Sequence, residues 1–172
     1  WVAYKVDAFD PSNRNGVAAQ LLAPLSFGET SAIHKKLVLD EQVVEFTEAD
    51  VNMNRDPGLL DIIARVKDPA KVNYVLAEID ACVAAARDQA PDPARLTALK
   101  SRLRYEFLMG LETPMSVARA LVRIIAVSGG MEAVDALYGA YEQVTGADVQ
   151  AAAQKYFVPN RRVVAVLRGG QS

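Results

Sequence analysis

Histidine and cysteine each occur only once in the 172 residues, as His34 and Cys82. A single cysteine excludes an internal disulfide and a zinc site built from cysteine pairs. A single histidine excludes every metal motif that takes two histidines from one chain. The sequence therefore predicts no metal ligands in this chain, and no residue is expected to be catalytic.

Long apolar runs and an excess of one charge are also missing. No segment approaches the roughly 18–20 consecutive apolar residues of a membrane-spanning helix. The 19 Lys and Arg residues nearly balance the 21 Asp and Glu residues, so the net charge is −2 and the pI is near 5.5. Glycine-rich G-x-G-x-x-G and G-x-x-x-x-G-K-[ST] motifs do not occur. We therefore expect no membrane span, no nucleic-acid partner and no doubly wound nucleotide-binding fold.

The composition is that of an ordinary globular protein, with 51% hydrophobic and 23% charged residues. A chain of this length buries roughly 70% of its unfolded surface, which supports a core without disulfides or metals. We therefore predict one domain over residues 1–172. The chain starts at Trp1 without a methionine and ends in Arg-Gly-Gly-Gln-Ser, which we interpret as the ends of a fragment of a longer chain, with a processed mature protein as the alternative.

Alternating apolar residues predict four strands. The first covers residues 1–9, and the last covers 162–168 with Val163, Ala165 and Leu167 facing inward. Residues 47–54 and 59–66 are expected to form an antiparallel hairpin, because the intervening Arg-Asp-Pro-Gly is a favourable turn sequence.

Helical patterns fill the rest of the chain. A helix is expected at 17–25, with Pro24 as a kink or stop, and a shorter one at 31–40. Three later helices begin with a capping residue followed by proline, at Asp68, Asp92 and Thr113. The later helices are predicted at 69–89, 93–111, 114–127, 131–144 and 145–157. This order predicts an α+β fold, with helices packed on one face of a mostly antiparallel sheet.

The two residues best suited to chemistry have simple structural explanations. A lone His34 between Ile33 and Lys35 is typical of a helix flank, since a zinc site needs three or four converging ligands. Cys82 lies among small residues and is interpreted as a small buried side chain.

Charged clusters have both a structural and a functional explanation. Glu41, Glu45, Glu48 and Asp50 could act as paired carboxylates, but the alternation favours the solvated face of an edge strand. A basic patch could bind phosphates or an acidic partner, although an amphipathic helix with a soluble face is the more usual explanation. Its candidate residues are Arg95, Lys100, Arg102 and Arg104, with Arg119 and Arg123 on the next helix.

Four segments, in their order and spacing, resemble one family. They are Phe27–Ser31 (FGETS), Leu37 with Glu41-Gln42, Arg55–Leu59 (RDPGL) and Lys100–Thr113 (KSRLRYEFLMGLET). Together they resemble the insulinase and pitrilysin superfamily of zinc metallopeptidases, and within it the non-catalytic domains of the C-terminal type. The resemblance covers nearly all of the chain.

The resemblance implies a fold and a role. Such domains have the α+β fold of processing-peptidase-like and LuxS-like domains. They combine with a homologous domain that carries an H-x-x-E-H zinc motif, in the same or a sister chain, and they wall a chamber that takes unfolded peptides. This chain lacks H-x-x-E-H, so the zinc cofactor is expected in the partner domain, and the longer protein is expected to be the peptidase. The resemblance also suggests a periplasmic location.

One family feature is absent. Some non-catalytic domains hold substrate with an arginine and a tyrosine, and the matching positions here are Val38 and Glu45. This departure favours a domain that follows a zinc domain within the first half of a two-half protein. An edge strand around residues 43–53 could still add to an extended peptide; the candidate positions are Val43, Glu45, Thr47, Ala49 and Val51.

Two other functions remain open. The same superfamily includes core subunits of respiratory complexes that have lost the zinc site, so a non-enzymatic scaffold subunit is one alternative. A stand-alone α+β binding domain without a peptidase link is the other.

Overall fold

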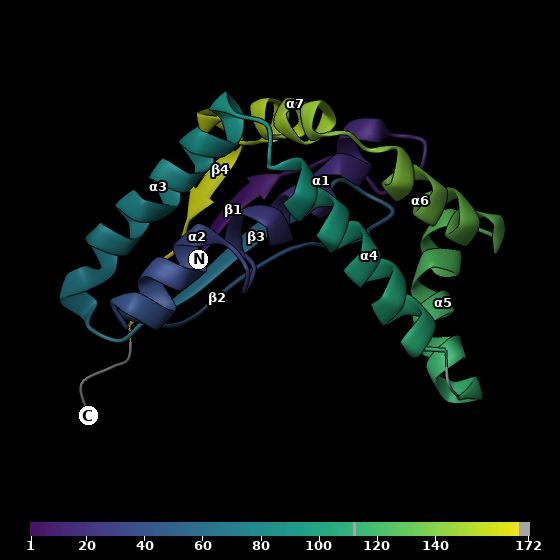
Figure 1. Cartoon of the computed structure of the whole chain (residues 1–172), viewed down its shortest axis with the longest axis horizontal. Coiled ribbons are helices and arrows are strands. Elements are labelled where there is room, and N and C mark those ends of the chain that lie inside the picture. The colour runs from purple at the N-terminus through teal and green to yellow at the C-terminus, as the bar shows by residue number, and fades with distance from the viewer. Residues whose placement is uncertain (112, 169–172) are drawn as a thin grey trace.

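The computed structural model describes residues 1–111 and 113–168. For Ala120 it describes the backbone only. Figure 1 shows four strands at the centre, with α3 along one flank and α4, α5 and α6 forming an arm on the other. The strands are β1 (Val2–Lys5), β2 (Val44–Val51), β3 (Leu59–Val66) and β4 (Arg162–Val164). The helices are α1 (Arg14–Phe27), α2 (Ala32–His34), α3 (Val72–Asp88), α4 (Pro93–Met109), α5 (Pro114–Ser128), α6 (Glu132–Gln143) and α7 (Gly146–Tyr156). A π-helix at Lys35–Asp40 and 3-10 turns at Pro69–Lys71 and Pro159–Arg161 complete the described elements.

The strands form one antiparallel sheet in the order β2-β3-β1-β4. The register places Val2 between Ile62 of β3 and Val164 of β4, so these three residues share one face. Since successive residues of a strand point to opposite faces, the sheet has two distinct surfaces. The predicted α+β class with an antiparallel sheet is confirmed.

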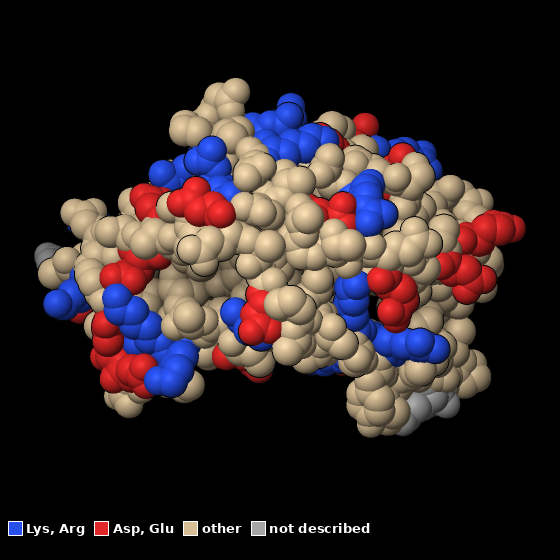
Figure 2. Space-filling model, turned by 45° about the horizontal axis from the view of Figure 1, so that its top comes forward, with Lys and Arg blue, Asp and Glu red and all other residues tan. Residues whose placement is uncertain are grey.

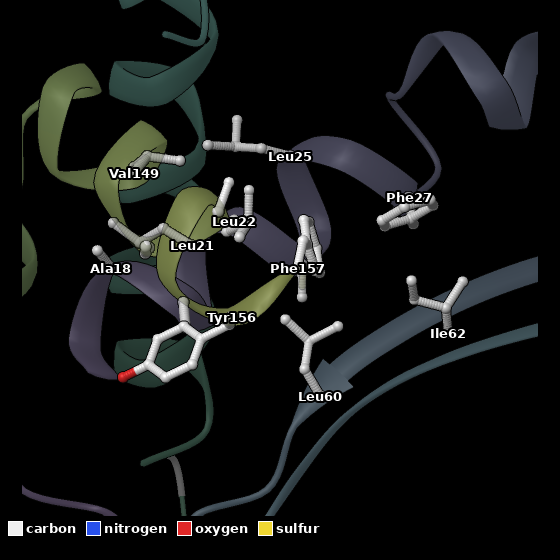
Figure 3. Packing of buried hydrophobic residues seen from close by; sticks show 14 of the residues in the cluster. Ala18, Leu21, Leu22, Leu25, Phe27, Leu60, Ile62, Val149, Tyr156 and Phe157 are labelled. Carbon is white, nitrogen blue, oxygen red and sulfur yellow. The ribbon is translucent and has the colours of Figure 1, made fainter. Parts of the chain in front are cut away.

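The core lies on the face that carries Val2, Tyr4, Leu60 and Ile62, all at most 2% exposed. Helix α1 packs on this face beside α7. Figure 3 shows Leu60 and Ile62 of β3 with Phe27 of α1 and Tyr156 and Phe157 at the end of α7.

An aromatic group closes this core. The ring of Phe157 lies 4.8 Å from that of Tyr4 and 6.4 Å from that of Phe27, centroid to centroid. One hydrophobic layer therefore joins the sheet, α1 and α7.

Capping explains where the later helices begin. Asp92 accepts hydrogen bonds from the amides of Ala94 and Arg95, and Thr113 accepts one from Ser116. Thr145 and Asp148 form a reciprocal capping box at the start of α7. The boundaries predicted from these residues are confirmed to within two residues, except that the segment after Asp68 starts as a 3-10 turn.

The prediction for the first helix was wrong at both ends. Helix α1 begins at Arg14 because the side chain of Asn13 caps it, and it runs to Phe27 through Pro24. Proline lacks an amide hydrogen and cannot complete the helical bond to the preceding turn. Burial of α1 against the sheet and α7 outweighs this loss.

The expected helix at 31–40 is only partly α-helical. Ser31 caps its start, but the chain then continues as the π-helix Lys35–Asp40. The amide of Glu41 accordingly donates to the carbonyl of Lys36, five residues back.

The hairpin was predicted correctly for β3, whereas its first strand is Val44–Val51 rather than 47–54. The register shifts between Val44 and Thr47, which is the position of a β-bulge. A bulge adds one residue to a strand, so two residues an odd number of positions apart can point to the same face. Val44 and Thr47 are both buried as a result.

The last strand differs most from the prediction. Only Arg162–Val164 is strand, and Val163 and Leu167, expected inside, are 59% and 100% exposed. Val163 lies on the face of the sheet opposite α1, where the described helices provide no cover. The terminal Gly-Gly-Gln-Ser, to which the interpretation of a fragment end applied, lies outside the described residues.

No helix within the described part of the chain has both the length and the apolar composition needed to cross a membrane.

Candidate functional site

Strand β2, where peptide binding was predicted, forms one edge of the sheet. Of the five candidate residues only Glu45 is exposed, and it lies 3.3 Å from Arg65. Thr47 is buried and Ala49 and Val51 are half-buried, and all three lie on the face covered by α1. Val43 precedes the strand, and its carbonyl accepts a bond from the amide of Lys67. Because these side chains mostly face the core, peptide could be held here only through the backbone of the edge.

Thr47 connects β2 to the segment that follows α1. Its hydroxyl donates to the carbonyl of Phe27 at 3.2 Å, and His34 Nδ1 lies 3.0 Å from the Thr47 hydroxyl oxygen. Since the single hydroxyl hydrogen goes to the carbonyl, the His34 nitrogen must be the donor, which fixes the proton on Nδ1. His34 is therefore a structural residue between α2 and β2, as its lone position predicted.

The π-helix carries a group of charged side chains facing α3. Tyr74 donates to the Glu41 carboxylate at 2.8 Å, and Lys36 lies 2.6 Å from Glu78. Lys35 pairs with Asp40 within the π-helix itself. Val38, which the resemblance matches to a substrate-binding arginine, is half-buried and packs against the hydrophobic core.

The acidic residues near β2 have different surroundings. Glu41 is bound by Tyr74 and Glu45 lies beside Arg65. Glu48 and Asp50 are exposed on the sheet face opposite α1. Among the described residues, no three His, Cys, Asp or Glu side chains come together as a metal site would require.

Cys82 is half-buried on α3, and its thiol donates to the carbonyl of Ser26. Burial raises the pKa of this thiol to about 11 and outweighs the charge of Arg95, which acts to lower it. A protonated thiol is a poor nucleophile, so the interpretation as a packing residue agrees with its surroundings.

Two basic residues of α4 bind backbone carbonyls of neighbouring helices. Arg95 donates to the carbonyl of Leu25 at the end of α1. Lys100 donates to the carbonyls of Glu142 and Val144 at the end of α6. Positive side chains at helix C-termini are favourable, because the carbonyls there lack partners in the helix. Figure 2 shows basic and acidic side chains interspersed over one face of the molecule.

A further cluster holds the loop after β1 to the end of α7. The Asp7 carboxylate accepts hydrogen bonds from Lys155 at 2.6 Å, Tyr156 at 2.8 Å and Asn13 at 3.3 Å. Partial burial acts to raise the pKa of Asp7, but the bonds from Lys155, Tyr156 and Asn13 outweigh it and lower the pKa to about 2.

The most distinctive surface is the sheet face opposite α1, which we call the open face. It carries Trp1, Leu59, Ile63 and Val163, which are 47%, 36%, 41% and 59% exposed. Ala3 lies between them and is 1% exposed. The indole of Trp1 is held in place by a 2.8 Å hydrogen bond from its Nε1 to Asp61. A sheet face with this many apolar side chains is typical of one that another element covers.

The open face escaped the sequence analysis, although a signal for it was present. Apolar residues fill both sets of alternating positions from Val163 to Leu167, and Trp1 and Ala3 accompany Val2 and Tyr4. Strands that are covered on both faces have such continuous apolar runs. The run was instead interpreted as a strand with a single buried face.

Comparisons with known proteins agree on the fold. No family model and no curated protein matches the chain. Among solved structures, a protease from Helicobacter pylori is similar over 94% of this chain and 38% of its own, with 21% identity and a TM-score of 0.83. The inactive peptidase domain of a zinc protease from Bordetella parapertussis is similar over 94% of this chain and 88% of its own, with 18% identity and a TM-score of 0.77. A chain of complex III from Candida albicans has 14% identity and a TM-score of 0.73, over 94% of this chain and 41% of its own.

At these identities the likeness establishes the fold. The chain has the fold of zinc-protease domains, including one described as inactive, and the fold implied by the resemblance is confirmed. The chain spans about two fifths of the Helicobacter pylori and Candida albicans chains.

Proposed function

We propose that this chain is a non-catalytic domain of a zinc metallopeptidase. It packs against a domain that carries the H-x-x-E-H motif and forms part of the wall of the chamber that takes unfolded peptides. The observation that carries the proposal is the open face, an apolar sheet surface on a domain whose fold recurs in a longer protease chain and in the inactive domain of a zinc protease. The proteolytic activity belongs to the longer assembly.

The residues present do not fit a zinc ion. One histidine occurs in the chain, its Nδ1 is turned toward Thr47, and no metal-ligand cluster exists among residues 1–111 and 113–168. A catalytic zinc site takes three protein ligands and an activated water. We therefore assign the zinc and its chemistry to the partner domain, and only packing and enclosure to this one.

The open face suits the packing role because of its composition. Trp1, Ile63 and Val163 form its apolar centre, and charged residues including Glu48 and Asp50 line the side of β2. Interfaces between domains and subunits commonly have an apolar, aromatic centre and a polar rim.

Peptide binding along β2 is a second part of the proposal. An edge strand can hydrogen-bond an extended peptide through its backbone, whatever the peptide's sequence. The bulge between Val44 and Thr47 would interrupt this ladder, so the straight stretch from Thr47 to Val51 is the expected contact region.

A scaffold subunit without proteolysis is the alternative that one observation favours. A chain of complex III from Candida albicans shares the fold at a TM-score of 0.73. Such a role would use the same open face, but the assembled protein would lack an H-x-x-E-H domain. A stand-alone binding domain, by contrast, would leave the open face uncovered.

Metal analysis and reconstitution test the proposal together. Purified 1–172 should contain no stoichiometric zinc and should not cleave an unfolded peptide. Mixed with the H-x-x-E-H segment of the same gene or of a sister gene, it should restore cleavage that neither part has alone. One equivalent of zinc in 1–172 would contradict the proposal. If no H-x-x-E-H segment restores cleavage, the scaffold alternative is favoured.

A further inference from the structure

The two edges of the sheet differ in chemistry. On β2 the exposed side chains are charged, at Glu45, Glu48 and Asp50, and a bulge interrupts the strand. Charges and bulges are the usual features that keep an edge strand from pairing with another chain. The opposite edge is formed by β4 and the residues that follow it up to Arg168, and we call residues 162–168 the β4 edge. It has no charge between Arg162 and Arg168, where the residues are Val-Val-Ala-Val-Leu.

The β4 edge also has free backbone groups. Trp1 and Ala165 exchange both hydrogen bonds, from the N-terminal amine to the Ala165 carbonyl and from the Ala165 amide to the Trp1 carbonyl. In an antiparallel pair, hydrogen-bonded residues alternate with residues whose amide and carbonyl point to the other side. Val164 and Val166 therefore direct their amide and carbonyl groups away from β1, toward an edge that no other described strand occupies.

The sequence of this segment is nearly palindromic. Residues 162–168 are Arg-Val-Val-Ala-Val-Leu-Arg, so positions equidistant from Ala165 carry the same or a closely similar residue. Two copies of such a strand, placed antiparallel about a twofold axis at Ala165, match like with like at every position. A twofold contact uses the same patch on both subunits, so a self-complementary segment fits it.

We propose that the β4 edge pairs with the β4 edge of a second copy of this chain. Val164 of each copy then lies opposite Val166 of the other and exchanges both backbone hydrogen bonds with it. Ala165 faces its own counterpart at a pair without hydrogen bonds, where the two side chains are closest. The two four-stranded sheets join into one continuous sheet, and both free edges at β4 disappear.

The ends of the pairing place Arg162 opposite Arg168 of the other copy. Like charges directly opposite are unfavourable, but Arg162 is already bound to Asp80 at 2.5 Å. The Asp80 side chain is 46% exposed, so its carboxylate also remains accessible to the incoming arginine.

Cysteine cross-linking tests this register directly. In a Cys82→Ser background, Ala165→Cys should form an intermolecular disulfide under mild oxidation, because the paired Cα atoms would be about 4.5 Å apart, within the range for a disulfide. Val163→Cys and Leu167→Cys should each fail alone, since each lies about 14 Å from its own counterpart at ~3.4 Å per residue. Mixed together, these two variants should cross-link. Cross-linking of either single variant as readily as Ala165→Cys would overturn the register.

A proline variant tests the dimer without a cross-link. Val166→Pro removes one outward amide hydrogen and leaves the bonds between Ala165 and Trp1 intact. Analytical ultracentrifugation over a concentration series should show a monomer–dimer equilibrium for the parent chain and a loss of dimer for Val166→Pro. Val166→Thr, which keeps the amide and a β-branched side chain, should still dimerise. A monomeric parent chain, or a dimer that Val166→Pro leaves unchanged, would overturn the proposal.

Discussion

The Nε1 atom of Trp1 donates a 2.8 Å hydrogen bond to Asp61, from the residue before β1 to the neighbouring strand β3. This bond fixes the one tryptophan of the chain on the open face, beside Ile63 in the register of β1 and β3. A held, half-exposed indole provides contact area at little cost in side-chain entropy, and tryptophan is enriched at the centres of interfaces. The bond therefore supports the proposal that the open face is a docking surface.

Thr47 gives a prediction about stability. Thr47→Val removes the hydroxyl that serves the Phe27 carbonyl and His34 Nδ1, both of which lose a buried partner. We expect the free energy of unfolding to fall by about 1–3 kcal/mol, the usual cost of an unsatisfied buried polar group. Urea denaturation measures the change.

Thr47→Ser is the matched control, because it keeps the hydroxyl and loses one methyl group. Its cost should be about 0.8 kcal/mol, from lost hydrophobic burial. Equal destabilisation by the two substitutions would show that the hydroxyl contributes nothing.

Asp7 gives a prediction about pH. Its pKa of about 2 in the folded protein lies below the ordinary value of 3.8, so the charged form is stabilised by folding. This stabilisation is present above about pH 4 and is lost as the pH falls toward 2.

We therefore expect Asp7→Asn to lower the free energy of unfolding by about 1 kcal/mol at pH 6, a value reduced for solvent screening of the half-exposed partners. The difference between the two proteins should shrink toward pH 2.5. Urea denaturation at both pH values provides the test, and a difference that is constant with pH would contradict the account of this cluster.

Cys82 gives a prediction about reactivity. Because burial raises the pKa of its thiol to about 11, only a very small fraction is thiolate at pH 7.5. Iodoacetamide should modify the folded protein much more slowly than the protein in denaturant, and the rate should rise as the pH approaches 10. Fast modification at neutral pH would instead indicate a reactive cysteine.

The sequence predicted best those features that depend on a few neighbouring residues. Three helices begin at the capping residues Asp92, Thr113 and Thr145. Each side chain caps amides two or three positions ahead, so the local sequence is sufficient to predict where the helix begins. The hairpin itself was also predicted, but residues 52–58 connect β2 to β3, a longer connection than the Arg-Asp-Pro-Gly turn that was expected.

Features that depend on distant packing were not predicted. Pro24 remains inside α1 because this helix is buried against the sheet and α7. The residues around Pro24 in the sequence do not show this packing. Val163 and Leu167 were placed inside because they are apolar, yet the described chain has nothing to cover them. The apolar run from Val163 to Leu167 was a signal for the open face, but alternation alone did not show which side of the sheet the helices cover. The lack of a zinc motif was evident from one histidine.

Peptide binding at β2 stays a proposal, and it concerns the backbone of this edge strand rather than its side chains. Thr47, Ala49 and Val51 face the α1 side of the sheet, so a substitution there acts on the core first. Sequence alternation indicates which residues share a face, but not which of the two faces is covered.

The affinity of the open face for the H-x-x-E-H domain tests the central claim most directly. Isothermal titration of that domain with 1–172 should give a 1:1 complex, and Ile63→Lys, which puts a charge at the apolar centre of the open face, should weaken it at least tenfold. Leu39→Lys is the matched control, since Leu39 is also exposed, at 59%, but lies on the π-helix away from this face. Loss of binding with Ile63→Lys alone is the predicted result, and equal affinity of Ile63→Lys and the parent chain would contradict the account.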